Sequence, residues 1–193
     1  MAAAERAGIS KEIVIVGNGD IASALIRAQN KGELAGGRLY CAAGVSNPNE
    51  TNEEEFHREK ELLRKKIREA EEKGLQLVYF STLAAAEPTK PYHHHKIGME
   101  KLIQELCPNY VIARLGIITW GDNPHTTINF LRSKVERNEQ FSIRDVTRDV
   151  LEEEEFIKLV NRLPYDGNHI VDFHGRTMTE QEIFYEFVLQ NHD

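Results

Sequence analysis

The sequence has few cysteines, no long apolar run and no excess of positive charge. Two cysteines in 193 residues rule out a disulfide scaffold, so Cys41 and Cys107 are expected to be free thiols in the core. No apolar run approaches the ~20 residues of a membrane-spanning helix, and residues 1–11 contain no apolar block of signal-peptide length. These absences predict a cytoplasmic protein. The net charge of −7 makes nucleic acids and membranes poor partners.

Short β-rich runs and amphipathic helices alternate along the whole chain. Residues 12–16 are almost all apolar and β-branched, which is typical of a strand buried on both faces of a parallel sheet. We predict a single α/β domain, residues 1–193, with a mainly parallel sheet and helices on both faces. Strands are expected at residues 12–16, 39–43, 77–80, 110–113, 141–143 and 169–171. Helices are expected at residues 20–31, 53–73, 91–106, 126–137 and 151–163, and after Thr179.

A glycine-rich turn follows the first strand. Gly17, Gly19 and Ala22 form a GxGxxA pattern, with Asp20 and Ile21 opening the next helix. Small residues at this point let a dinucleotide pyrophosphate approach the backbone and sit at the positive N-terminus of the helix. The pattern indicates a cofactor-binding turn, although glycines also form ordinary tight turns.

A second candidate site is formed by Tyr92 and Lys96, four residues apart on one face of a predicted helix. An ammonium group near a phenol lowers the pKa of the phenol, which would let Tyr92 transfer a proton near neutral pH. Ser81 and Thr82 end the preceding strand, at the sheet edge where α/β proteins bind ligands. Their hydroxyls would hydrogen-bond a substrate oxygen beside the tyrosine. The alternative is a surface tyrosine and a solvated lysine.

Taken together, seven segments resemble the extended short-chain dehydrogenase/reductase superfamily, the branch of nucleotide-sugar epimerases and dehydratases. They are residues 12–22, 42–46, 78–82, 92–96, 114–121, 148–155 and 169–183, in the family's order along almost the whole chain. The resemblance implies a Rossmann-like fold, NAD or NADP as the cofactor, and a nucleotide-linked sugar as the substrate. It also implies that residues 115–193 add a small substrate-binding region.

The resemblance also implies residue roles. Tyr92 would be the acid/base, assisted by Lys96, while Thr82 and Ser81 orient the sugar. The cofactor would be held by Gly17, Gly19, Asp20, Ile21, Ala42, Ala43 and Gly44. Arg148 would contact the substrate diphosphate, and Trp120 would stack on a base or sugar unless it packs in the core.

The family often forms dimers through two helices, which here are residues 53–73 and 92–106. Phe56, Leu63, Ile67 and Ala70 give the first of these helices one apolar side. This side faces either the sheet or a second subunit. The resemblance therefore implies a homodimer.

The chain departs from the family before residue 53. The family has three strands between its first helix and this point, whereas only residues 39–43 are strand-like here, so the second and third strands are missing and the sheet is reduced. The second strand normally ends in the acidic residue that binds the adenosine ribose. Glu33 and Arg38 lie in a glycine-rich connection and are no convincing equivalents. Two further functions therefore stay open: a non-catalytic nucleotide-binding or regulatory module, and a cofactor-independent enzyme that uses Tyr92.

Three histidines, His93, His94 and His95, lie inside the Tyr–Lys spacing. Consecutive helical residues point about 100° apart and cannot converge on one ion. We therefore expect solvent-facing or substrate-side histidines and no metal site.

Overall fold

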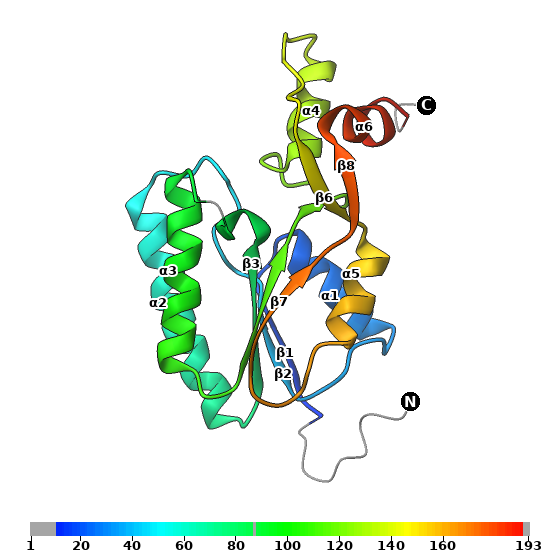
Figure 1. The fold of residues 1–193 in the computed structure, drawn as a ribbon. Helices are drawn as coiled ribbons and strands as arrows, with labels where there is room; N and C mark the ends of the chain where they lie inside the picture. Colours follow the sequence, from blue (N-terminus) through cyan, green and yellow to red (C-terminus); the bar gives the residue numbers. More distant parts are fainter. Residues whose placement is uncertain (1–10, 87, 191–193) are drawn as a thin grey trace.

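The computed structural model describes residues 11–86 and 88–190. Five parallel strands form the main sheet in the order β1-β2-β3-β4-β7 (Figure 1). They are β1 (Ile13–Val16), β2 (Arg38–Cys41), β3 (Gln76–Thr82), β4 (Tyr110–Leu115) and β7 (Asn168–Phe173). The predicted α/β class with a mainly parallel sheet is confirmed. Most of residues 1–11, on which the expected cytoplasmic location depends, lie outside the described residues.

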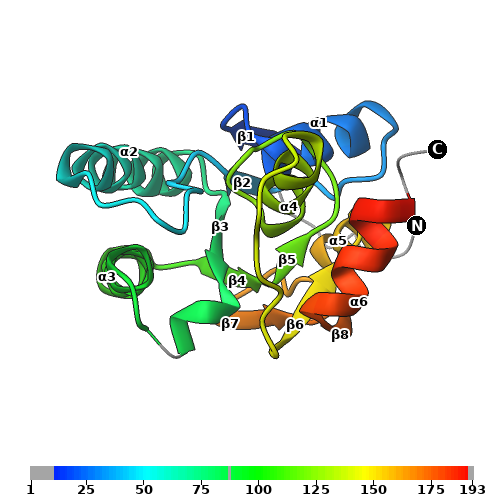
Figure 2. The ribbon, with the colours of Figure 1, turned by 90° about the horizontal axis from the view of Figure 1, so that it is seen from above.

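Two helices cover each face of this sheet. α2 (Glu53–Glu72) and α3 (Pro91–Leu106) lie on one face, and α1 (Asp20–Asn30) and α5 (Glu153–Asn161) lie on the other (Figure 2). Alternate residues of each strand supply the two cores. Leu39 and Tyr79 pack under α2 and α3, whereas Tyr40 and Val78 pack under α1 and α5. Continuous apolar strands are what a sheet covered on both faces requires.

The connection from β1 through α1 to β2 is left-handed. β1, β2, β3 and β4 run parallel and lie side by side in chain order, so each crossover moves in the same direction across the sheet. The crossovers through α2 and α3 are right-handed, and α1 lies on the opposite face (Figure 2). Right-handed crossovers make up about 98% of such connections. The connection through α1 is left-handed because residues 31–37 lead from α1 directly to β2, which lies on the same side of β1 as the later strands.

No strand lies beyond β1 in the described part of the chain, which confirms the predicted loss of two strands. The expected position of Arg38 in the glycine-rich connection is wrong, because Arg38 is the first residue of β2. Its side chain is fully buried and donates hydrogen bonds to the carbonyl oxygens of Val160 (3.0 Å) and Leu163 (2.6 Å) at the end of α5. Arg38 therefore ties β2 to α5 and has no access to a ligand.

A smaller sheet and two helices sit above the carboxyl ends of the main strands (Figure 1). The sheet contains β5 (Ile117–Ile118), β6 (Thr147–Leu151) and β8 (Arg176–Thr179). α4 (Thr127–Glu136) and α6 (Glu180–Phe184), which continues into a π-helical turn (Tyr185–Leu189), pack on it. The expected strand at residues 141–143 is wrong: the Phe141 ring packs on Phe184 instead of pairing in a sheet.

The other expected helices are present with ends shifted by at most two residues, and the capping box of Thr179 and Glu182 is confirmed. Cys41 and Cys107 are buried and unpaired, as predicted. None of the helices described is both long enough and apolar enough to cross a membrane.

Candidate active site

The predicted site lies where the loops after β1, β2 and β3 meet. Gly17 has a φ of +127°, and a Cβ there would lie 2.5 Å from the carbonyl oxygen of Ala42. The glycine turn is therefore pressed against residues 42–44 at the end of β2. Gly19 is the N-cap of α1 and has open space around it, so no side chain caps the first-turn N–H groups. Ile21 packs its side chain into the core.

The loop after β5 is bound to the first turn of α1. The Asp20 carboxylate accepts hydrogen bonds from the backbone N–H groups of residues 122 and 123 (3.1 and 3.2 Å), and a Cβ on Gly121 would lie 2.0 Å from Asp20 Cγ. Trp120 donates its indole N–H to the Asp20 carbonyl (3.2 Å) and packs against Phe156. These contacts favour core packing of Trp120, the alternative to stacking on a base.

Ser81 and Thr82 end β3 with different partners. The buried Ser81 donates a hydrogen bond to Glu100 of α3 (2.6 Å), which also accepts two from Arg114 (3.0 and 2.6 Å). The Thr82 hydroxyl accepts from the backbone N–H of Ala84 (3.2 Å) and is half-buried. Its proton stays available to a ligand, so Thr82 is better placed than Ser81 to orient a substrate.

Tyr92 lies in the first turn of α3, and its hydroxyl has no hydrogen-bond partner among the described residues. Its ring meets the ring of His93 edge-on at 5.7 Å. Burial raises the pKa of Tyr92, Lys96 lowers it, and Glu59 raises it further. The expected effect of Lys96 on the Tyr92 pKa is therefore present but outweighed. The phenol holds its proton at neutral pH.

Lys96 is held in a buried ion pair. Its ammonium lies 2.9 Å from Glu59 Oε1 and 3.1 Å from the Tyr79 hydroxyl, and 5.8 Å from the centre of the Tyr92 ring. Burial alone would lower the pKa of Lys96, but Glu59 outweighs it and the pKa is raised. Lys96 therefore stays charged, with most of that charge neutralised by Glu59.

Glu59 of α2 is the centre of this cluster. Besides Lys96, its carboxylate accepts hydrogen bonds from Tyr79 (2.7 Å) and from the backbone N–H of Val45 (2.7 Å), and it lies 2.8 Å from His95 Nε2. Burial opposes ionisation, but Lys96 and the bonds from His95 and Tyr79 hold the pKa of Glu59 well below its usual range. The cluster joins α2, α3, β3 and the loop after β2.

Sequence reasoning did not single out Glu59, yet the sequence contains a signal for it. Residue 59 lies three positions after Phe56 and four before Leu63, within the apolar stripe of α2. Leu63, Ile67 and Ala70 of this stripe are buried against the sheet. A carboxylate at such a position needs a buried partner, because an unpaired charge in the core is costly.

The three histidines point in different directions, but the expectation that they face solvent or a substrate is wrong for His95, whose side chain is buried against Glu59. His93 Nδ1 accepts a hydrogen bond from the Thr89 backbone (3.2 Å), His94 is exposed, and His95 stacks on Phe56 at 4.4 Å. In the described ranges, no three His, Cys, Asp or Glu side chains are grouped to hold a metal ion.

Arg148 lies on β6, with Met178 as its Cα partner on β8. It is close enough to the start of α3 to affect His93, whose pKa is lowered first by burial, then by Lys90, His94 and Arg148. Arg148 has no ion pair within the described residues. Arg148 also helps to lower the pKa of Glu180 on α6, so its charge acts on α6 as well as on the start of α3.

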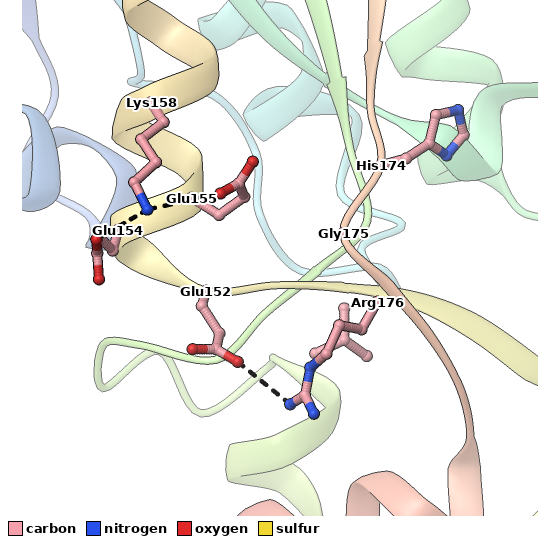
Figure 3. Close-up of a pocket in the computed structure, with 8 residues that line it drawn as sticks. Glu152, Glu154, Glu155, Lys158, His174, Gly175 and Arg176 are labelled. Carbon is pink, nitrogen blue, oxygen red and sulfur yellow. Dashed lines mark ion pairs between the residues drawn. The ribbon is translucent and has the colours of Figure 1, made fainter.

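A surface hollow of about 360 Å³ lies elsewhere, between β6, α5 and the start of β8 (Figure 3). Its charges pair with one another: Arg176 lies 3.2 Å from Glu152, and Lys158 lies 2.8 Å from Glu154. None of the predicted site residues lines it, so it is not the predicted site.

Solved structures match most of this chain, whereas no protein-family model and no curated protein does. UDP-glucose 4-epimerase of Thermus thermophilus in complex with NAD has a TM-score of 0.63, with 16% identity over 90% of this chain and 80% of that one. The Bordetella bronchiseptica enzyme WbmG in complex with NAD has a TM-score of 0.61, with 16% identity over 89% of this chain. The chain has the fold of nucleotide-sugar epimerases.

The same epimerase fold is shared with a reductase. dTDP-4-dehydrorhamnose reductase of Bacillus anthracis in complex with NADP has a TM-score of 0.64, with 16% identity over 91% of this chain and 80% of that one. This chain spans 60% of the length of WbmG. The predicted resemblance is therefore confirmed at the level of the fold.

The epimerase fold places a dinucleotide across the carboxyl ends of the strands, and only one half of such a cofactor fits here. The uncapped first turn of α1 and the open space at Gly19 suit a phosphate group. The adenosine ribose would need an acidic residue on a strand beyond β1, and no such strand exists among the described residues. In addition, the Lys96 ammonium is already paired with the Glu59 carboxylate. The residues fit the phosphate end and not the adenosine end.

Proposed function

We propose that this chain is an enzyme that acts on a nucleotide-linked sugar as an epimerase, dehydratase or ketoreductase, with Tyr92 as its acid/base. The proposal is supported by the position of Tyr92 in the first turn of α3, the helix that follows the carboxyl end of β3 at Thr82, and by the lack of a hydrogen-bond partner for its hydroxyl among the described residues. Because the pKa of Tyr92 is raised, its first task is to donate a proton to a sugar oxygen. Thr82 orients that oxygen, and Arg148 binds the diphosphate.

A nicotinamide nucleotide would supply hydride transfer in this reaction. The turn at Gly17 and Gly19 would hold its phosphate, with residues 42–44 lining the pocket. The choice between NAD and NADP stays open in this proposal, because the described residues supply no adenosine subsite that would distinguish them. The Lys96 ammonium lies 5.8 Å from the centre of the Tyr92 ring, and its charge is balanced by Glu59.

The test is a turnover screen of UDP- and dTDP-linked sugars with oxidised and reduced NAD and NADP. For an accepted substrate, Tyr92→Phe should lower turnover by at least about 100-fold, because proton transfer contributes about 10²–10⁴-fold. Tyr185→Phe removes a hydroxyl from an exposed tyrosine and serves as the control. Unchanged turnover in Tyr92→Phe would refute the role of Tyr92. Turnover that needs Tyr92 but no nicotinamide would support a cofactor-independent enzyme.

The second candidate is a non-catalytic module that binds a nucleotide. It is favoured by the Glu59–Lys96 ion pair and by the absence of strands beyond β1 in the described part of the chain. Saturable binding of a UDP- or dTDP-sugar by calorimetry, with no turnover under any cofactor condition, would replace the first proposal by this one.

A further inference from the structure

The strand β1 has an open outer edge. The carbonyl oxygens of Glu12 and Val16 accept hydrogen bonds from the β2 side, from Gly37 (2.8 Å) and Ala42 (2.8 Å). Backbone groups alternate in direction along a strand, so the N–H and C=O groups of Ile13 and Ile15 point away from β2. No strand pairs with them in the described part of the chain.

The two edges of the main sheet differ in composition. β7, at the far edge, alternates between exposed and half-buried positions up to the buried Phe173, and it carries His169 and Asp172. Charged side chains of this kind protect an edge strand from pairing with another chain. β1 consists of two isoleucines and two valines, all half-buried, with no charge. β1 therefore has the composition of an interior strand in an edge position.

A neutral facet of α1 extends this open edge. Arg27 points towards α5, where it binds Glu153 (2.7 Å). At 100° per residue, the exposed Ile26 and Gln29 lie 100° and 160° away from Arg27 around the helix, on the side away from α5. Ile26 is 42% exposed. The facet carries no charge, although the chain as a whole has a net charge of −7.

We propose that β1 pairs with β1 of a second copy of this chain, antiparallel about a two-fold axis. An axis at Ile15 places Ile15 opposite its own counterpart and Ile13 opposite the counterpart of Gly17. Outward-facing backbone groups then meet outward-facing groups, and no like charges oppose each other. The two copies of Ile26 face each other across the axis. Two chains of equal net charge can approach here because the strand and the α1 facet are neutral.

A second copy is the occupant that this edge favours. Self-pairing of β1 closes the assembly after two chains, whereas β1 paired with β7 of the next chain would continue as an open polymer. That pairing would also bring Asp172 and His169 to the contact. The proposal does not depend on the proposed function. It also differs from the homodimer through α2 and α3, helices on which Leu106 is the only large apolar side chain, among the described residues, that is more than a third exposed.

The test is the mass of the full chain in solution, measured by light scattering after gel filtration. Wild type should run at twice 22.1 kDa. Ile26→Lys and Ile13→Pro should each halve that mass: the first places a charge at the axis, and the second removes an outward N–H without breaking a bond to β2. Circular dichroism confirms that each variant is folded, and Ile26→Lys alone suffices if Ile13→Pro is not.

Two matched variants locate the contact. Ile170→Lys on β7 and Leu106→Lys on α3 both charge an exposed apolar side chain, and both should leave the dimer intact. Exchange of the Ile13 and Ile15 amide hydrogens with solvent should slow as the protein concentration rises. The proposal is overturned if wild type is monomeric at the highest concentration tested. It is also overturned if Leu106→Lys or Ile170→Lys dissociates the dimer while Ile26→Lys does not.

Discussion

Replacing Glu59 by glutamine should destabilise this chain far more than breaking an exposed ion pair on the same helix. The side chains of Glu59 and Lys96 are 3% and 4% exposed. Glu59→Gln leaves the Lys96 ammonium buried without a counter-charge and weakens the bonds to Tyr79 and Val45. Breaking a buried ion pair by removing one partner costs about 3–5 kcal/mol.

Thermal and urea unfolding would measure this loss. For a chain of this size, 1 kcal/mol shifts the midpoint temperature by about 2–4 °C, so Glu59→Gln should unfold about 6–20 °C lower. Arg58→Ala, one residue away, breaks an exposed pair with Glu55 and should cost less than about 1 kcal/mol. Adding Lys96→Met to Glu59→Gln should recover much of the loss, because no buried charge is then unpaired.

The pH dependence of stability gives an independent measurement. The folded pKa of Glu59 lies below that of the unfolded chain. Its contribution is therefore complete above the unfolded carboxyl pKa of about 4.3 and is lost as the pH falls below it. Glu59→Gln should flatten the acid limb of the stability curve. A loss under about 1 kcal/mol at neutral pH, with an unchanged acid limb, would refute the buried ion pair.

Three other stability predictions can be measured by urea unfolding. Tyr79→Phe removes a hydroxyl that bonds both Glu59 and Lys96 and should cost about 1–3 kcal/mol. Tyr40→Phe removes a buried hydroxyl that lies near Arg38 but has no hydrogen bond of good geometry among the described residues, so it should cost less; equal losses would contradict this. Gly98→Ala in α3 should stabilise by about 0.5–1 kcal/mol, because the added Cβ meets nothing within 4 Å; a loss would contradict it. Gly121→Ala should cost more than about 1 kcal/mol, since φ is +88° and the Cβ would clash; no loss would contradict it.

The order of the main elements could be predicted from local patterns. The sequence predicts a helix at residues 91–106, and α3 has these bounds, because proline at the first position and an apolar periodicity mark both ends. The small sheet could not be predicted in the same way. β5 has two residues and β8 reads Arg-Thr-Met-Thr, so neither shows a period long enough to be recognised. Residues 141–143 have a strand-like composition, but the Phe141 ring finds its contact on Phe184.

The sequence predicted which elements carry the candidate site residues, but it did not predict the partners of their side chains. Tyr92 and Lys96 do lie on one helix, and Thr82 does end the neighbouring strand. Which partner each side chain chooses depends on residues distant in the sequence. Glu59 on α2 pairs with Lys96 on α3, and the Asp20 carboxylate binds the backbone of the loop at residues 122–123. Local spacing contains no information on such contacts, although a carboxylate in an apolar stripe indicates that one exists.

Because the crossover through α1 is left-handed, additional strands could be inserted into this chain next to β1. α1 already lies on the face from which a right-handed connection would lead to a strand beyond β1. A strand–helix–strand–helix unit inserted between Gly32 and Gly37, which both have positive φ, would start and finish at the amino end of the sheet, where α1 ends and β2 begins. Such an insertion would replace the left-handed crossover through α1 by right-handed ones, and it would create a binding site for an adenosine. It would also occupy the edge at which two copies are proposed to meet, so gaining a complete cofactor site and remaining a dimer would become alternatives.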